Sequence, residues 1–422
     1  MGPEIITLIF LVAAIVLFTT EVIPLSVTAM LLSTGFAITG VLEPTEAFAG
    51  FVDSNVLLFM AMFIIGAAIF ETGMAKQIGS VVTKFAKTER QLIVAVMLIT
   101  GLMSGLLSNT GTAAVLIPVV IGIAQRSGFA RGRLLLPLVI AAAMGGNLSL
   151  IGAPGNLIAQ SGLQGVGGSF SFFEYAKIGL PILIVGIIYF AFFGYKFLPD
   201  AKPSKSNTIF DEEVDYSTVP AWKRHVSLAV LVLTVAAMVF EKQIGVKLYV
   251  SAWLGALLLV VFKVIDEDTA VRSIDMKTIL LFVGSLSLAA ALQKSGAGET
   301  LADTIVSIMG SNPSPMVVMA VMLILSAVLT NFMSNTATTA LLVPISILIA
   351  QQIGADPKAV LMATVIGGSF AYATPIGMPA NAMVYNIGNY RFNDYVKAGL
   401  PLIIISIIIT FILLPIVFPF YP

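Results

Sequence analysis

Cysteine is absent from this chain, and histidine occurs only once, as His225. Disulfide bridges and thiolate metal sites are therefore excluded, and neither a metal centre nor an activated nucleophile has a candidate. His225 follows two basic residues at the start of an apolar stretch, where we expect it at a membrane interface. The sequence also lacks a phosphate-cradling glycine loop, which argues against ATP as an energy source. We therefore predict no enzyme activity and no cofactor.

Charge is also scarce. Charged residues make up 10% of the chain and hydrophobic residues 58%, whereas an average soluble domain is about 25% charged. Many apolar runs reach the roughly 20 residues that a helix needs to cross the hydrocarbon core of a bilayer. Acidic and basic residues are equal in number, and this balance alone indicates nothing about partners; we expect no nucleic-acid partner. The composition predicts an all-α polytopic membrane protein surrounded by the lipid bilayer.

Two apolar segments, 91–125 and 314–351, are too long to be single spans. A straight helix of about 35 residues would measure over 50 Å, against ~30 Å of hydrocarbon. A similar polar triplet interrupts each segment, Ser108-Asn109-Thr110 in the first and Ser334-Asn335-Thr336 in the second. The arms on either side are too short to cross the membrane. We therefore predict two re-entrant hairpins, each with its triplet buried at the tip.

The charges that flank the two hairpins differ in sign. Lys and Arg are concentrated on the cytoplasmic side of membranes, so we expect the hairpins to enter from opposite faces, the first from inside. Counting both as non-crossing leaves ten spans in a plasma (inner) membrane, with both termini external. The basic residues around the first hairpin are Lys76, Lys84, Lys87, Arg90, Arg126, Arg131 and Arg133, and the acidic residues around the second are Glu299, Asp303 and Asp356.

The two halves of the chain resemble each other. The triplets lie 226 residues apart, and Tyr175-Ala-Lys-Ile-Gly-Leu-Pro181 matches Tyr395-Val-Lys-Ala-Gly-Leu-Pro401. Five spans per half would make the second copy inverted, as in many secondary transporters. The first repeat, 1–198, would contain scaffold spans 1–72, an interfacial helix 73–90, the hairpin 91–125, a broken helix 134–161 and a span 175–198. A cytoplasmic linker, 199–224, would lead to the second repeat, 225–422, with spans 225–293, an interfacial helix 296–310, the hairpin 314–351, a broken helix 358–387 and a span 397–419.

The hairpin tips have the chemistry of ion binding. Ser, Asn and Thr offer neutral oxygens suited to a hard monovalent cation. A helix that begins at each tip would present free N–H groups and its positive dipole end to an anion. Alternatively, each triplet only caps a turn or joins helices by hydrogen bonds. Its repetition in two segments that cannot cross favours a functional role.

A second pair of motifs is predicted to break a helix in each half. They are Gly152-Ala153-Pro154-Gly155-Asn156 and Gly377-Met378-Pro379-Ala380-Asn381. Proline and glycine interrupt helices and free backbone carbonyls, which can coordinate a cation opposite each hairpin tip. An ordinary proline kink is the alternative.

Together these motifs resemble the divalent anion:sodium symporter family of the ion-transporter superfamily, which includes dicarboxylate and citrate carriers. The resemblance covers nearly the whole chain, and the segment 373–385 is especially similar. It implies a homodimer that carries a small anion together with sodium by an elevator motion.

The resemblance also implies which residues bind, by motif match. The sodium ligands would be Ser104, Ser108, Asn109 and the Gly152 carbonyl at one site, and Thr330, Ser334, Asn335 and the Gly377 carbonyl at the other. The substrate-binding residues would be Asn109, Thr110, Ala153, Pro154, Asn335, Thr336, Met378 and Pro379.

Two features depart from the family pattern. Its dicarboxylate carriers often have a hydroxyl residue immediately before the motif proline, where this chain has Ala153 and Met378. The substrate would therefore be smaller, less polar or held differently. We also expect the extra first span of the family to be missing, which would give ten crossings in place of eleven.

We expect a sodium-coupled symporter of di- or tricarboxylates. The apolar spans contain no buried basic residue, so helix ends and bound cations would offset the charge of the anion. A sodium-independent anion exchanger and a transporter of metalloid or other inorganic anions of the same superfamily are alternatives. A sodium/proton antiporter would need a buried titratable carboxylate. A channel would need an open pore, whereas broken repeats favour alternating access.

Overall fold

The computed structural model describes residues 1–83, 88–200, 216, 218–310 and 313–421. Within these ranges every regular element is helical and no β-strand occurs, which confirms the all-α expectation. The elements of the first half are α1 (Pro3–Thr20), α2 (Leu25–Ile38), α3 (Pro44–Ala47), η1 (Ala49–Val52), α4 (Ser54–Glu71), α5 (Met74–Thr83), α6 (Glu89–Ser104), α7 (Asn109–Ser127), α8 (Gly132–Gly145), α9 (Pro154–Gly165), α10 (Ala176–Phe192) and η2 (Gly194–Phe197). Those of the second half are α11 (Ala221–Val239), α12 (Glu241–Ile244), α13 (Leu248–Val261), α14 (Glu267–Arg272), α15 (Met276–Ser295), α16 (Ala297–Met309), α17 (Pro315–Leu329), α18 (Asn335–Gln352), α19 (Pro357–Gly368), α20 (Pro379–Ile387) and α21 (Phe392–Val417).

Among the described residues, five helices are long and apolar enough to cross a membrane, judged by length and composition: α1, α4, α11, α15 and α21. Shorter helices such as α2, α10 and α13 are apolar as well. The outward face of α21 carries aliphatic side chains at helical spacing, with Ile404, Ile408 and Ile412 all exposed. Such a surface suits contact with lipid acyl chains, while each helix satisfies its own backbone hydrogen bonds.

Helices near the start of each half pack against helices of the other half. Helix α2 packs against α15 of the other half, and its counterpart α13 packs against α4. Aspartate residues cap the starts of α4 and α15 in the same way. The Asp53 side chain accepts hydrogen bonds from the N–H groups of Asn55 and Val56. The Asp275 side chain does the same for the N–H groups at the start of α15.

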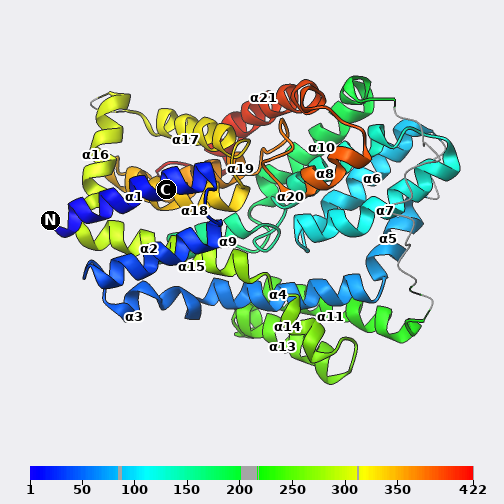
Figure 1. The fold of residues 1–422 in the computed structure, drawn as a ribbon, viewed down its shortest axis with the longest axis horizontal. Helices are drawn as coiled ribbons and strands as arrows, with labels where there is room; N and C mark the ends of the chain where they lie inside the picture. The colour runs from blue at the N-terminus through cyan, green and yellow to red at the C-terminus, as the bar shows by residue number, and fades with distance from the viewer. Residues whose placement is uncertain (84–87, 201–215, 217, 311–312, 422) are drawn as a thin grey trace.

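The two polar segments form helical hairpins. Helices α6 and α7 both pack against α8, and α17 and α18 pack in the same way against α19. In Figure 1, α5 lies across one end of the molecule beside the first hairpin, and α16 lies across the opposite end beside the second. The entry of the two hairpins from opposite faces of a membrane stays a prediction, and so does the assignment of the cytoplasmic face.

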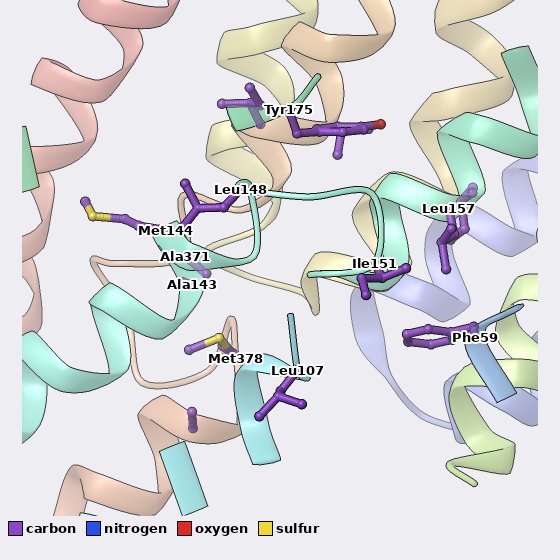
Figure 2. Packing of buried hydrophobic residues seen from close by; sticks show 14 of the residues in the cluster. Phe59, Leu107, Ala143, Met144, Leu148, Ile151, Leu157, Tyr175, Ala371 and Met378 are labelled. Atoms are coloured by element: carbon purple, nitrogen blue, oxygen red, sulfur yellow. The ribbon is translucent and has the colours of Figure 1, made fainter. Parts of the chain in front are cut away.

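Both helix breaks fall at the glycine and proline motifs. Helix α8 ends at Gly145 and α9 begins at Pro154, while α19 ends at Gly368 and α20 begins at Pro379. Helix α8 lies at the centre of the molecule, since all its residues from Leu134 to Gly145 are buried. Figure 2 shows how its Met144, the following Leu148 and Ile151, and Met378 of the other break fill this central region.

Two predicted segments lie partly outside the described residues. In the predicted linker, residues 201–215 and 217 are not described, and α11 already begins within it, at Ala221. In the predicted interfacial helix 73–90, residues 84–87 are not described, and α5 accounts for its first part.

Candidate functional site

A cavity of about 720 Å³ lies where the two hairpin tips and the two helix breaks converge. Its volume is within the range of small-molecule binding pockets. Both polar triplets line it, together with the break segments 152–156 and 377–379. All residues predicted to bind sodium or substrate line the cavity except Ser104 and Thr330, which are fully buried. Segments far apart in sequence thus form one site.

Four helices begin at the wall of this cavity. They start at Asn109, Pro154, Asn335 and Pro379, and each of these residues lines the cavity. The first N–H groups of a helix lack intrahelical partners, and its N-terminus carries a partial positive charge. A small anion in this cavity would meet four such helix ends, so its charge can be offset without a ring of basic side chains.

The serine of each triplet acts as the N-cap of the helix that follows. The Ser108 hydroxyl oxygen accepts a hydrogen bond from the N–H of Gly111 at 3.1 Å. Ser334 accepts one from the N–H of Ala337 at 3.2 Å. Each serine therefore has a capping role in the structure, and a role in ion binding stays a prediction. The asparagine and threonine that follow are partly exposed and line the cavity.

Asn109 lies in a cluster of oxygen atoms. One terminal atom of its amide lies 2.6 Å from the Ser104 hydroxyl oxygen and 3.1 Å from each of the carbonyl oxygens of Gly152 and Ala142. A nitrogen in this position donates hydrogen bonds to the three oxygens. Because the Ser104 hydroxyl already donates to the Ala142 carbonyl, the three neighbouring oxygens act as acceptors, so the amide nitrogen fits this position. Rotation of the amide would bring its oxygen into the group.

The second half repeats this cluster. The Thr330 hydroxyl lies 2.7 Å from the Asn335 side-chain oxygen and donates to the carbonyl of Gly368. Thr330 and Gly368 lie 226 residues after Ser104 and Ala142, whose hydroxyl-to-carbonyl hydrogen bond is 2.7 Å. The two hairpin tips are therefore bonded to the ends of α8 and α19 by equivalent contacts.

An asparagine stabilises each helix break. The Asn156 amide donates to the carbonyls of Gly146 at 2.8 Å and Ser149 at 2.7 Å, across the segment between α8 and α9. Asn381 donates in the same way across the second break. Its acceptors are the carbonyls of Ala371 at 2.7 Å and Thr374 at 3.0 Å. The breaks are thus defined loops with satisfied carbonyls and not frayed helix ends.

The repeated Tyr…Pro motif stabilises the same breaks. Tyr175 donates through its hydroxyl to the Asn156 carbonyl at 3.2 Å, and Tyr395 donates to the Asn381 carbonyl at 2.7 Å. Both tyrosines are fully buried. The motif that indicated the internal repeat therefore stabilises the helix breaks that line the cavity.

Some residues of the site were not predicted. Within the part of the chain that the structure describes, Lys277 is the only Lys or Arg that lines the cavity. The acidic residues Glu71 and Asp275 line the cavity as well. All three are exposed. The cavity therefore reaches the surface beside α4's last residue, at the end of the molecule where α5 lies (Figure 1).

One face of α4 forms an apolar wall of the cavity. Its residues are spaced three or four apart, which places them on one side of a helix. Apolar residues at this spacing usually indicate core packing, so the sequence alone gave no signal of a lining role. They are Phe59, Met62, Phe63, Gly66 and Phe70.

Comparison with known proteins gives a consistent result. The family model described as citrate transporter matches residues 15–367 and 235–421. An uncharacterized transporter of Methanocaldococcus jannaschii is 28% identical over 94% of this chain and 90% of its own length. The sodium-dependent high-affinity dicarboxylate transporter 3 of Caenorhabditis elegans is 27% identical over 90% of this chain and 77% of its own. The sodium-dependent dicarboxylate transporter SdcS of Staphylococcus saprophyticus is 23% identical, with 94% and 84% covered.

Two solved structures share the fold. The YdaH transporter of Alcanivorax borkumensis superposes with a TM-score of 0.68 at 16% identity, over 92% of this chain and 89% of its own. The efflux pump MtrF of Neisseria gonorrhoeae superposes with a TM-score of 0.64 at 15% identity, over 99% and 95%. At these identities the likeness concerns the fold alone.

Proposed function

The chain belongs to the citrate transporter family, and on that premise we propose that it carries small di- or tricarboxylates across the membrane together with sodium. It is a membrane transporter with dicarboxylate transporters among its relatives, so the resemblance to divalent anion:sodium symporters is confirmed. The coupling ion, the substrate class and the movement are the parts that we propose.

Four helix N-termini at one cavity are the observation that carries the anion proposal. In secondary transporters, half-helix N-termini typically face the anionic groups of the substrate. Asn109, Thr110, Asn335 and Thr336 would add side-chain donors to the free N–H groups. The motif prolines Pro154 and Pro379 would shape the wall, because proline suits the first position of a helix.

The oxygen clusters support the sodium proposal. Around Asn109, the oxygens of Ser104, Gly152 and Ala142 surround one amide atom at 2.6–3.1 Å. Hard cations prefer oxygen ligands, and unwound backbone carbonyls beside half-helix ends are typical sodium ligands in transporters. Ser108 would contribute to the first site. At the second site, we propose Thr330, Ser334, Asn335 and the Gly377 carbonyl as ligands.

The packing of the helices supports an elevator motion as part of the proposal. Helix α18 packs against α9, and α7 packs against α20, so hairpins and broken helices of both halves contact one another. In a second group, α2 packs extensively against α15, and α13 packs extensively against α4, while α15 and α4 contact the first group less extensively, through α18 and α9. The first group would move as a unit against the second. A homodimer, which the family resemblance implies, would keep the second group in place.

Uptake into proteoliposomes tests the proposal. We expect an inward sodium gradient to increase the uptake of labelled succinate or citrate about tenfold or more over choline. Asn109→Ala and Asn335→Ala should each raise the sodium concentration for half-maximal uptake at least about tenfold, since a charge-assisted oxygen contact contributes ~1.5–3 kcal/mol. Asn393→Ala is the matched control, because Asn393 is exposed on α21 and does not line the cavity.

Three results would contradict parts of the proposal. Carboxylate uptake that needs an internal counter-anion but no sodium would indicate an exchanger. Uptake of sulfate or arsenite without any carboxylate would indicate an inorganic-anion transporter. Equal sodium dependence in Asn109→Ala and in Asn393→Ala would remove Asn109 from the sodium site.

A further inference from the structure

The cavity has a polar side and an apolar side. The four helix N-termini and the two triplets form the polar side. On the apolar side, Phe63, Ala67 and Phe70 of α4 lie three or four residues apart on one face of the helix. All three are only partly buried, so a molecule in the cavity can contact their side chains. Binding pockets commonly combine such apolar walls with a few polar groups that orient the ligand.

The apolar wall lies beside one of the helix ends. A Cβ atom added to Gly111, the third residue of α7, would lie 2.6 Å from a ring carbon of Phe70 and 2.7 Å from the Ser108 hydroxyl oxygen. The Phe70 ring therefore lies within one turn of the start of α7 at Asn109, where the first N–H groups lack intrahelical partners. A carboxylate held by these N–H groups brings its carbon chain close to the ring.

The apolar wall has a recess between its two phenylalanines. Gly66 lies between Phe63 and Phe70 on the same face of α4 and lines the cavity. A Cβ atom added to Gly66 would meet only Leu107 at 3.8 Å and Phe70 at 4.0 Å, which is ordinary van der Waals contact. Leu107 lines the cavity as well. The wall therefore has space for at least one further carbon atom in apolar surroundings.

The aromatic wall occurs on one side of the cavity. All aromatic side chains that line the cavity, in the part of the chain that the structure describes, belong to α4. Helix α15 begins behind an aspartate cap as α4 does, but it contributes Lys277, Thr278 and Leu281 to the lining. The helix ends that face an anion come from both halves, whereas the aromatic wall comes from one. A ligand that fits both features has carboxylates at its ends and one apolar side group.

The positions before the motif prolines add apolar surface. Ala153 and Met378 both line the cavity and have no hydrogen-bonding group in their side chains, apart from the weakly accepting sulfur of methionine. A hydroxyl group of a substrate gains little from them, whereas a carbon substituent loses nothing.

We propose that the preferred substrate is a dicarboxylate with one apolar side group, whose carboxylates lie at the helix N-termini and whose side group lies against Phe63, Ala67 and Phe70. The inference rests on the proposed function, which supplies the sites for the carboxylates and for sodium. The side group leaves water on binding, and each methylene group that is buried favours binding about fourfold. A hydroxyl in its place would lose hydrogen bonds to water, and the three side chains of the wall replace none of them.

Competition against the sodium-driven uptake of labelled succinate by the wild-type protein is the first test. We expect one enantiomer of methylsuccinate to bind at least about threefold more tightly than succinate, and phenylsuccinate at least about tenfold more tightly. Malate has a hydroxyl where methylsuccinate has its methyl group, so it is the size-matched control and should bind no more tightly than succinate. Mass spectrometry of the vesicle contents then shows whether methylsuccinate is carried as well as bound.

Variants of α4 locate the side group. Phe70→Ala removes the ring and should reduce the preference for phenylsuccinate over succinate to within about threefold, while Phe70→Leu keeps apolar surface and should retain most of the preference. Gly66→Ala adds a methyl group that meets nothing closer than 3.8 Å, so the variant should fold and should reduce the same preference by occupying the recess. Phe192→Ala is the matched control and should keep the wild-type ratio, because Phe192 is exposed on α10 and does not line the cavity.

Each outcome decides between the two proposals. Equal affinity for succinate, methylsuccinate and phenylsuccinate, with sodium-driven succinate uptake intact, would overturn this inference and leave the carrier proposal in place. Tighter binding of malate than of methylsuccinate would overturn it as well, and so would a preference that survives both Phe70→Ala and Gly66→Ala. Binding of no dicarboxylate would contradict both proposals. If Phe70→Ala does not fold, Gly66→Ala and the wild-type series still decide.

Discussion

The two helices that begin behind aspartate caps, α4 and α15, meet the broken helices in different ways. At the start of α4, the Asn55 amide donates to Ser161 and Gln164 of α9, both at 2.9 Å, and Ser161 donates to Asp53 at 3.0 Å. At the start of α15, the counterpart Lys277 is exposed and lines the cavity. The structure gives Lys277 no equivalent bond to a described residue of α20.

This difference defines two ends of the site. The contact group of Asp53, Asn55, Ser161 and Gln164 closes the end where α4 begins, and the end where α15 begins is open to the surface. The residues that correspond to Ser161 and Gln164 are Asn386, in α20, and Asn389, just after α20, and both are exposed. The two halves of the chain, which resemble each other in sequence, are therefore arranged differently at these equivalent positions. Alternating access requires such a pair of arrangements, which exchange between the ends.

Fixing the closed end should have the largest effect. In the double variant Asn55→Cys with Ser161→Cys, a thiol-bridging reagent such as mercuric ion should nearly abolish uptake, and excess dithiol, which removes the mercuric ion from the two thiolates, should restore it. The natural chain has no cysteine, so no other thiol reacts and the untreated wild type is the control. Full uptake with the cross-link in place would show that α9 does not move against α4.

A second cross-link tests the open end of the site, where α15 begins. If the ends exchange, Lys277 approaches α20 only in the other state, so Lys277→Cys with Asn386→Cys should cross-link only in that state. Conditions that favour the first cross-link should lower the yield of the second, because the two states are mutually exclusive. Yields that rise and fall together across sodium and substrate concentrations would contradict the exchange. Mass spectrometry of the linked peptides measures both yields.

Glycines at the two breaks should respond unequally to alanine. A Cβ atom at Gly377 would lie 2.3 Å from the Thr330 carbonyl oxygen, and one at Gly152 would lie 2.5 Å from that of Gly146. Backbone cannot yield easily, so each alanine should destabilise the fold by roughly 1–3 kcal/mol, more at Gly377, and lower uptake sharply. Thermal unfolding in detergent measures the order.

The control for these glycines is Gly165→Ala at the end of α9. No atom lies within 4 Å of a Cβ at this position, so alanine should leave uptake intact and be neutral or slightly stabilising. If Gly377→Ala behaved like Gly165→Ala, the break would be flexible enough to absorb a side chain, and the defined loop around Asn381 would not be rigid.

The sequence predicted the parts of the site that depend on local chemistry. Proline and glycine placed the breaks at 145–154 and 368–379, and the triplets placed the starts of α7 and α18. Residues brought in from distant helices were missed. The Phe59 face of α4 looks like core, and Asn147 and Ser369, which line the cavity and bond to each other, lie 222 residues apart with no shared motif. The unequal ends were also beyond prediction, because the repeats are similar in sequence and differ in conformation.

The smallest effect concerns an ion pair at the closed end. Glu46 of α3 accepts a hydrogen bond from Lys294, the last basic residue of α15, and this bond together with the N–H of Glu43 lowers the pKa of the Glu46 carboxyl. A lowered pKa means that the ion pair stabilises the folded state above the ordinary pKa of ~4.3 and that this stabilisation is lost as the pH falls. Glu46→Gln should therefore unfold at a slightly lower temperature than the wild type at pH 7, and the difference should shrink as the pH falls below the ordinary pKa and vanish only below the lowered pKa of the folded state. The pair is exposed, so the difference at pH 7 should also shrink in high salt. A difference that persisted at low pH would assign the effect to packing of α3 and not to charge.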